Sequence, residues 1–317
     1  MSHHKKKYIL ISLIFIIVLF CVSFYGYSIN GEREENYRAS VILEASNTER
    51  FEVLKQGIES AAREYHMEVN VITVSTKTGA YECVNAIKRE LKNGSTGLIL
   101  NLGNDKKVLK ELDALLPGIQ VVLFESEIPI SKGYSYIAPD NYQMGYDIGL
   151  TILQKKRSED KVGIVVGNGK KSANNDRMRG LLEAIGQDCV LWTVEGEEDS
   201  VKEELKEAQG NQPVDILVGL NTISTEEIID LTKDNNQAGI VYGIGGSEKI
   251  VYYVDKGLVG GLVAPNEYLM GYLSVKSMYN RMNYNMTEDK KDIGYLLINK
   301  TNLYQEENQK LMFPMVQ

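Results

Sequence analysis

Cysteine and histidine are scarce in this sequence. Its 317 residues include three Cys, at positions 21, 83 and 189, and three His, two of which stand among the first four residues. Three isolated cysteines supply neither a disulfide framework nor a C-x-x-C pair, and the histidines leave little for a zinc site. The sequence therefore predicts no metal and no cofactor.

A basic surface is also missing. The first 30 residues contain three Lys and no acid, which leaves 32 basic and 43 acidic residues in the rest of the chain, a net charge of −11. Proteins that bind nucleic acid carry a basic patch or stripe that meets the phosphates. We therefore expect no nucleic-acid partner.

The amino terminus has a long apolar run. Residues 8–27 follow three lysines and contain no charge. This length suits a membrane helix of about 20 residues with the lysines on the inner side, whereas the apolar region of a signal peptide is usually about 7–15 residues. We expect residues 1–30 to be a membrane anchor or a signal segment and residues 31–37 a linker. Either alternative places the rest of the chain outside the cytoplasm; an anchor makes a single span in the cell membrane.

Apolar segments and amphipathic helices alternate after the linker. Continuous apolar segments such as "ASVILEA", "GLILNL" and "VDILVGL" predict strands buried on both faces, and the apolar residues of "RFEVLKQGIESAAREY" recur at helical spacing. This alternation is typical of parallel sheets covered by helices, and it is long enough to occur twice. The sequence predicts an α/β fold with two doubly wound parallel-sheet lobes that meet near residues 137–145.

The loops after the predicted strands are rich in Asn, Ser, Thr, Glu and Arg. Ligands bind at the carboxyl ends of strands in such sheets, but no loop joins a nucleophile, a general base and an orienting partner. The pattern favours binding of a polar small molecule and predicts that the protein is not an enzyme. The turn "VYGIGGSEK" offers a nucleotide-binding alternative, yet it lacks the third glycine of G-x-G-x-x-G and stands late in the chain.

Four segments carry a family resemblance: "SYIAPDNYQMGYDIG", "SANNDRMRGLLEAI", "DILVGLNTISTEEI" and "GIGGSEKIVYYVDKGLVGGLVAPNEYLMG". In their order and spacing, residues 38–303 resemble the ribose/galactose-type periplasmic binding proteins, whose ligand domain also occurs in lactose-repressor-type regulators. The resemblance implies two lobes joined by a three-crossing hinge that includes Asp140 and Asn141. The expected ranges are 38–139 plus 265–290 for the N-terminal lobe, 140–264 plus 291–303 for the C-terminal lobe, and 304–317 for a tail.

The resemblance also implies a set of ligand-binding positions: Arg50, Phe51, Glu125, Arg177, Asn221, Gly245 and Asn266. Five of these positions also have a structural alternative: a helix core for Phe51, a turn for Asn221 and a solvated surface for the charged residues. Asp140 is expected to cap the helix that begins at about residue 142. Gly245 stands where the family usually has an Asp, which we expect to open room, to expose backbone N–H groups and to favour a ligand bulkier or more anionic than a plain pentose.

These observations predict a membrane-tethered, extracytoplasmic solute-binding protein. It would act as a monomer, close over a carbohydrate-like small molecule and pass it to an ABC permease. The alternative is a ligand-sensing partner of a membrane sensor kinase, with a ligand other than ribose. A transcription regulator would need a helix-turn-helix before the first strand, where the apolar run stands instead.

Overall fold

The structure is a computed structural model that describes residues 16–21, 37–44, 51–75, 80–167, 169–192, 198–233, 239–286 and 290–312. The chain divides into two units, Met1–Asn36 and Tyr37–Gln317. In the first unit, residues 16–21 are helical and exposed, and the rest of the apolar run at 8–27 lies outside the described residues. No helix in the described part of the chain has both the length and the apolar character needed to cross a bilayer.

The first lobe is built on a six-stranded sheet with the order β11-β5-β4-β3-β1-β2, in which all neighbouring strands are parallel. Its strands are β1 (Arg38–Glu44), β2 (Glu68–Val74), β3 (Gly97–Asn101), β4 (Gln120–Phe124), β5 (Ser135–Ala138) and β11 (Lys291–Asp292). The central strands β3 and β4 are buried almost throughout, because helices cover both faces.

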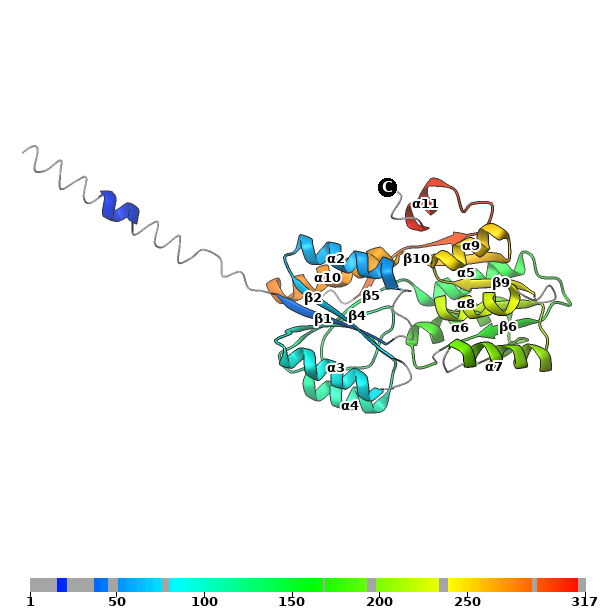
Figure 1. The fold of residues 1–317 in the computed structure, drawn as a ribbon, viewed down its shortest axis with the longest axis horizontal. Helices are drawn as coiled ribbons and strands as arrows, with labels where there is room; N and C mark the ends of the chain where they lie inside the picture. The colour runs from blue at the N-terminus through cyan, green and yellow to red at the C-terminus, as the bar shows by residue number, and fades with distance from the viewer. Residues whose placement is uncertain are drawn as a thin grey trace, which may run out of the picture. The chain divides into compact units, whose positions relative to one another are not determined.

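Two pairs of helices cover this sheet (Figure 1). Helices α2 (Glu52–Glu64) and α10 (Glu267–Tyr284) pack on one face, and α3 (Ala80–Lys92) and α4 (Lys106–Leu115) pack on the other. Side chains alternate between the two cores along each strand: Ile99 faces α2 and α10, whereas its neighbours Leu98 and Leu100 face α3 and α4.

The second lobe repeats the plan with the strand order β12-β10-β9-β8-β6-β7. Its strands are β6 (Val162–Val165), β7 (Val190–Trp192), β8 (Ile216–Gly219), β9 (Ile240–Ile244), β10 (Val259–Pro265) and β12 (Tyr295–Ile298), of which β12 alone is antiparallel to its neighbour among the described strands. Helices α5 (Asn141–Leu153) and α6 (Ser172–Ile185) cover one face. Helices α7 (Glu198–Asn211), α8 (Thr222–Lys233) and α9 (Glu248–Lys256) cover the other.

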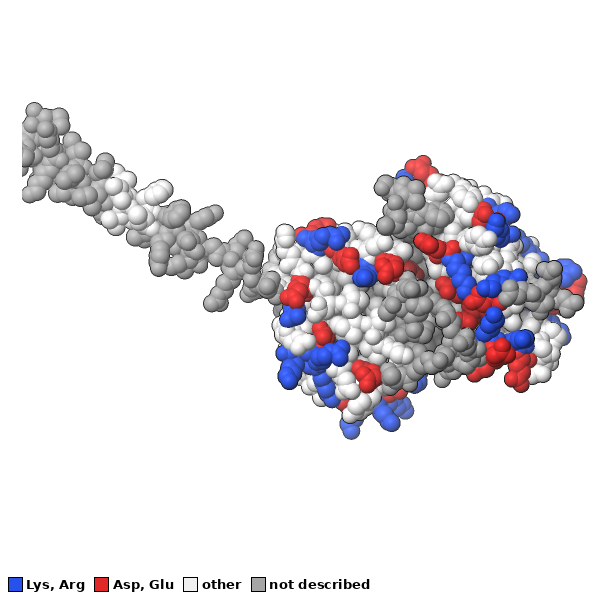
Figure 2. Space-filling model, viewed as in Figure 1, with Lys and Arg blue, Asp and Glu red and all other residues white. Residues whose placement is uncertain are grey.

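Acidic and basic side chains are interspersed on the face of the molecule that Figure 2 shows, without a continuous basic stripe on that face. A short helix, α11 (Glu306–Met312), lies within the expected tail.

The chain passes between the lobes three times: from β5 to α5, from β10 to α10, and from β11 to β12. The strand pairings shift the expected lobe bounds by one or two residues. Pro265 pairs with Tyr295 in the second sheet, and β11 at 291–292 pairs with β5 in the first sheet. The two-lobe α/β architecture is the one that the sequence predicts.

Candidate functional site

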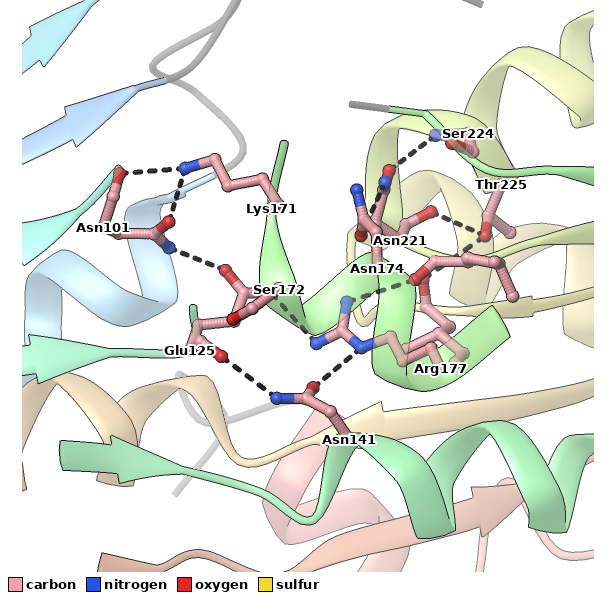
Figure 3. Close-up of polar contacts among 12 residues, drawn as sticks. Asn101, Glu125, Asn141, Lys171, Ser172, Asn174, Arg177, Asn221, Ser224 and Thr225 are labelled. Carbon is pink, nitrogen blue, oxygen red and sulfur yellow. Dashed lines mark hydrogen bonds and ion pairs between the residues drawn. The ribbon is translucent and has the colours of Figure 1, made fainter. Parts of the chain in front are cut away.

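The polar residues at the strand ends of the two lobes contact one another directly (Figure 3). From the first lobe come Asn101, the last residue of β3, and Glu125, which follows β4. From the second lobe come Lys171, which precedes α6, and Arg177 within α6. These positions follow from the doubly wound topology, because all parallel strands of a lobe end at the same edge of the sheet.

The backbone at Glu125 has an unusual conformation that three residues hold in place. Its φ is +57°, which is uncommon for a residue other than glycine. The backbone N–H of Glu125 donates to the Ile137 carbonyl at 3.0 Å. Its carbonyl accepts from the Tyr136 hydroxyl at 2.8 Å and from Asn141 Nδ2 at 3.0 Å. This conformation turns the carboxylate of Glu125 toward the second lobe (Figure 3).

The Glu125 carboxylate joins the two lobes. Its Oε1 accepts from Arg177 Nη2 at 3.0 Å, and its Oε2 accepts from Asn101 Nδ2 at 2.7 Å. Burial by itself raises the pKa of Glu125, but the charges of Arg177 and Lys171 and the hydrogen bond from Asn101 outweigh burial and hold the pKa below its ordinary value. Glu125 is therefore ionised at neutral pH.

Arg177 is buried, and each of its three guanidinium nitrogens has a partner. Besides the bond to Glu125, Nε donates to Asn141 Oδ1 at 2.9 Å and Nη1 donates to the Leu220 carbonyl at 3.1 Å. A Cβ atom at Gly145 in α5 would lie 1.9 Å from the Arg177 carbonyl oxygen, so the glycine allows α6 to approach α5 closely. The side chain of Arg177 thus connects the first lobe, the first crossing and the second lobe.

Further contacts join the loop before α6 to the first lobe. The backbone N–H of Glu127 donates to Ser172 Oγ at 2.7 Å, and the backbone N–H of Asn104 donates to the Lys170 carbonyl at 2.8 Å. Lys171 Nζ donates to the carbonyl of Asn101 at 2.9 Å and also to its side-chain oxygen. The lobes therefore meet through paired polar groups at these strand ends.

Three of the residues singled out in the sequence cap helices with their side-chain oxygens. Asp140 caps α5, Asn221 caps α8 and Asn266 caps α10, each accepting a backbone N–H at 2.9 Å. The cap at Asp140 confirms the prediction for that residue. The Nδ2 group of Asn221 donates to Asn174 Oδ1 at 3.2 Å. A ligand-binding role for Asn221 and Asn266 stays a prediction.

Phe51 precedes α2 and is half-buried against the core that α2 and α10 share. This contact matches the structural alternative for Phe51, and stacking on a ligand stays a prediction. Arg50 lies outside the described residues.

Gly245 does not have the surroundings that the sequence led us to expect. A Cβ atom there would lie 2.7 Å from Thr222 Oγ1 and 2.9 Å from Thr222 Cα, and φ is +153°. The N–H of Gly245 donates to the Val263 carbonyl at 3.0 Å, and the residue is buried. The expectation of open room was wrong, because Thr222 fills the space. The N–H of Gly245 is not among any exposed N–H groups of this loop, because it bonds to the next strand.

Glu267 is a residue of this region that sequence reasoning missed. It is the first residue of α10, directly after the second crossing, and it is half-buried. Burial, with a smaller contribution from the Glu125 carboxylate, raises the pKa of Glu267 to about 8, although Arg177 opposes the rise. The only signal in the sequence is an acid beside the crossing, which an ordinary helix start also carries.

Residues 39–285 match the family described as the periplasmic binding protein domain. The chain belongs to this family. The resemblance found in the sequence is thereby confirmed, and no curated protein matches the chain in sequence.

Several solved binding proteins share the fold. A carbohydrate transporter solute-binding protein from Agrobacterium radiobacter, in complex with D-arabinose, has a TM-score of 0.78 and 15% identity over 88% of this chain and 99% of its own. A glucose-galactose binding protein from Geobacillus stearothermophilus has a TM-score of 0.75 and 18% identity over 86% of this chain and 100% of its own. A sugar transporter from Clostridium phytofermentans has a TM-score of 0.74 and 20% identity over 84% of this chain and 100% of its own.

Proposed function

We propose that this chain is a membrane-tethered, extracytoplasmic solute-binding protein that closes over a sugar-like small molecule and passes it to an ABC transporter. The observation that carries the proposal is the bridge from Glu125 to Arg177, which joins the strand ends of both lobes. Proteins of the same fold are described as complexed with D-arabinose or as binding glucose and galactose, which supports a carbohydrate ligand. The uncharged run at residues 8–27 supports the tether.

The bridge has the chemistry that sugar hydroxyls need. A hydroxyl donates one hydrogen bond and accepts others, whereas the Glu125 carboxylate only accepts and the Arg177 guanidinium only donates. A hydroxyl placed beside this pair bonds to both lobes at once, with charge-assisted hydrogen bonds. Binding of the sugar is then coupled to closure of the lobes about the crossings, with Asp140 and Asn141 at the first of them.

A thermal-shift measurement on the full-length chain tests this function. The panel contains D-arabinose, D-glucose, D-galactose and D-fucose. A sugar at 100 times its Kd stabilises the folded state by about 2.7 kcal/mol, which raises Tm by several degrees in a protein of this size. If no carbohydrate raises Tm, the proposal is wrong.

Two arginine variants locate the site. Arg177→Gln removes the charge that Glu125 faces, and we expect it to abolish the sugar-induced shift. Arg179→Gln is the matched control, because Arg179 lies two residues further along α6 with its side chain 68% exposed and paired with Asp176. Arg179→Gln should retain the full shift. An equal response from both variants would remove Arg177 from the site.

A further inference from the structure

Five tyrosine side chains gather on the first lobe, around the residue at which the chain enters it. Between ring centroids, Tyr279 in α10 lies 5.6 Å from Tyr37 and 4.9 Å from Tyr65. Tyr284 lies 6.2 Å from Tyr279, and Tyr272 lies 6.3 Å from Tyr65. We call this cluster the aromatic patch: Tyr37, Tyr65, Tyr272, Tyr279 and Tyr284.

The aromatic patch keeps accessible surface, although its rings are held in place. Tyr284 is 60% exposed, Met286 is 52% exposed, and the other four rings are half-buried. The Tyr37 hydroxyl donates to Asn283 Oδ1 at 3.0 Å, and Asn283 Nδ2 donates to the Tyr279 hydroxyl at 3.0 Å. Because these rings are already ordered, contact with a partner costs little conformational entropy.

The aromatic patch lies away from the junction of the lobes. Tyr37 directly precedes β1, and the parallel strands of a sheet begin at one edge and end at the opposite edge. Asn101 ends β3 and Glu125 follows β4, so both stand at the other edge. In Figure 1, β1 begins at the end of the first lobe that is farther from the second lobe. A partner on the patch therefore does not compete with the contacts between the lobes.

A short stretch of chain joins the aromatic patch to the uncharged run near the amino terminus. Nine residues, 28–36, separate the run at 8–27 from Tyr37. Nine residues span at most about 30 Å even when they are fully extended. With the run in a bilayer, Tyr37 stays within that distance of the membrane surface. Since Tyr37 belongs to the patch, the tether brings this edge of the lobe to the membrane, and not the edge with Glu125.

We infer that the aromatic patch docks on the membrane interface, with its rings among the phospholipid head groups. This inference rests on the membrane tether of the proposed function and adds the surface that meets the bilayer. A tyrosine has an apolar ring and a polar hydroxyl, and Tyr and Trp are enriched at membrane–water interfaces for this reason. Docking through the patch orients the strand ends that carry Glu125 away from the bilayer, where a sugar from outside can reach them.

Quenching by brominated lipids tests the inference on the full-length chain in phosphatidylcholine vesicles. Tyr284→Trp places an indole in the patch, and the wild-type spectrum corrects for Trp192, which is buried in the second lobe. We expect lipids brominated near the head groups to quench most of the added emission, with its maximum shifted to shorter wavelength. Tyr252→Trp is the matched control, because Tyr252 is 53% exposed on α9 of the second lobe. Its added emission should be unaffected.

Met286→Trp provides a second reporter that leaves all five tyrosines of the patch in place. We expect its added emission to be quenched as well. Adding Tyr284→Asp to this variant should lower the quenching, because the interface would have to accommodate a carboxylate in place of a ring. Adding Tyr252→Asp instead is the control and should leave the quenching unchanged.

Each other outcome has a distinct meaning. If the chain floats with the vesicles but the emission added by Tyr284→Trp is not quenched, the inference is wrong and the tether stands. If Tyr252→Trp is quenched as strongly, or if Tyr284→Asp leaves the quenching at position 286 unchanged, the patch does not direct docking and the inference is again wrong. If the chain does not float with the vesicles, the proposed tether fails and the inference fails with it. Sugar binding is measured separately, and Tyr284→Trp should retain the sugar-induced rise in Tm.

Discussion

Replacing Glu267 by Gln removes an acid that the folded protein holds in an unfavourable environment. In the unfolded chain this carboxyl loses its proton near its ordinary pKa of 4.5, whereas in the folded protein it keeps the proton up to about pH 8. Between these values the unfolded state binds fewer protons, so the free energy of unfolding falls as the pH rises, by about 1.4 kcal/mol per pH unit. The loss is absent below pH 4.5 and complete above pH 8.

Over the whole range from pH 4.5 to about pH 8, the loss in free energy of unfolding would be about 5 kcal/mol. Glu267 keeps some contact with solvent, which screens part of the repulsion, and we therefore expect about 2–3 kcal/mol. Glu267→Gln should thus be more stable than the wild type by this amount at pH 8.5 and about equally stable at pH 4.

Urea unfolding of the full-length wild type and variant at pH 4, 6 and 8.5, without any sugar, measures this difference. Glu248→Gln serves as the control, since its exposed side chain should give no pH-dependent gain. The reasoning is refuted if the stability difference between Glu267→Gln and the wild type is the same at all three pH values. It is also refuted if that difference shrinks as the pH rises, because the carboxyl would then be better accommodated when ionised.

Three glycines give further predictions. Gly145→Ala should destabilise the protein by more than 2 kcal/mol and lower sugar affinity, because the added methyl would overlap the Arg177 carbonyl at 1.9 Å. Gly210→Ala is the control, because a Cβ at this position in α7 meets nothing within 4 Å, and it should be neutral or stabilising by up to about 1 kcal/mol in urea unfolding. Equal losses of stability in Gly145→Ala and Gly210→Ala would show that close packing at Gly145 is not the cause. Gly245→Asp should cost about 1–3 kcal/mol and leave calorimetric sugar affinity no higher, because Thr222 occupies the space; a tighter-binding variant would show that the loop accepts the acid.

The architecture could be predicted because its signals are local. Continuous apolar runs and helical stripes fix which segments become strands and helices, and their alternation implies parallel pairing. The exact residues at which the chain crosses between the lobes were harder to predict, because the pairing register between strands decides them. Pro265 lies in the second sheet because it pairs with Tyr295, a partner that no local pattern identifies.

The site was predictable as a set of positions but not as a set of contacts. Glu125 and Arg177 could be marked as polar residues at strand ends, yet their bond depends on how the two lobes meet. Gly245 was misjudged because the space beside a glycine depends on a neighbour from another helix, Thr222. Glu267 was missed because an acid at the start of a helix is ordinary in a sequence, and only its surroundings make it unusual.

The two carboxyls at the junction of the lobes have divergent environments. Burial disfavours the ionised form of both carboxyls. At Glu125, Arg177, Lys171 and Asn101 outweigh the effect of burial and lower the pKa. At Glu267 the attraction of Arg177 does not outweigh burial, and the pKa is raised. Because Glu125 is ionised and paired, its negative charge further discourages ionisation of Glu267. The first acid therefore joins the lobes, and its charge helps to keep the second protonated. Such a division predicts that removing Glu125 would lower the pKa of Glu267 and so reduce the stability that Glu267→Gln gains at high pH in urea unfolding, whereas removing Glu267 would leave the Glu125–Arg177 bond intact.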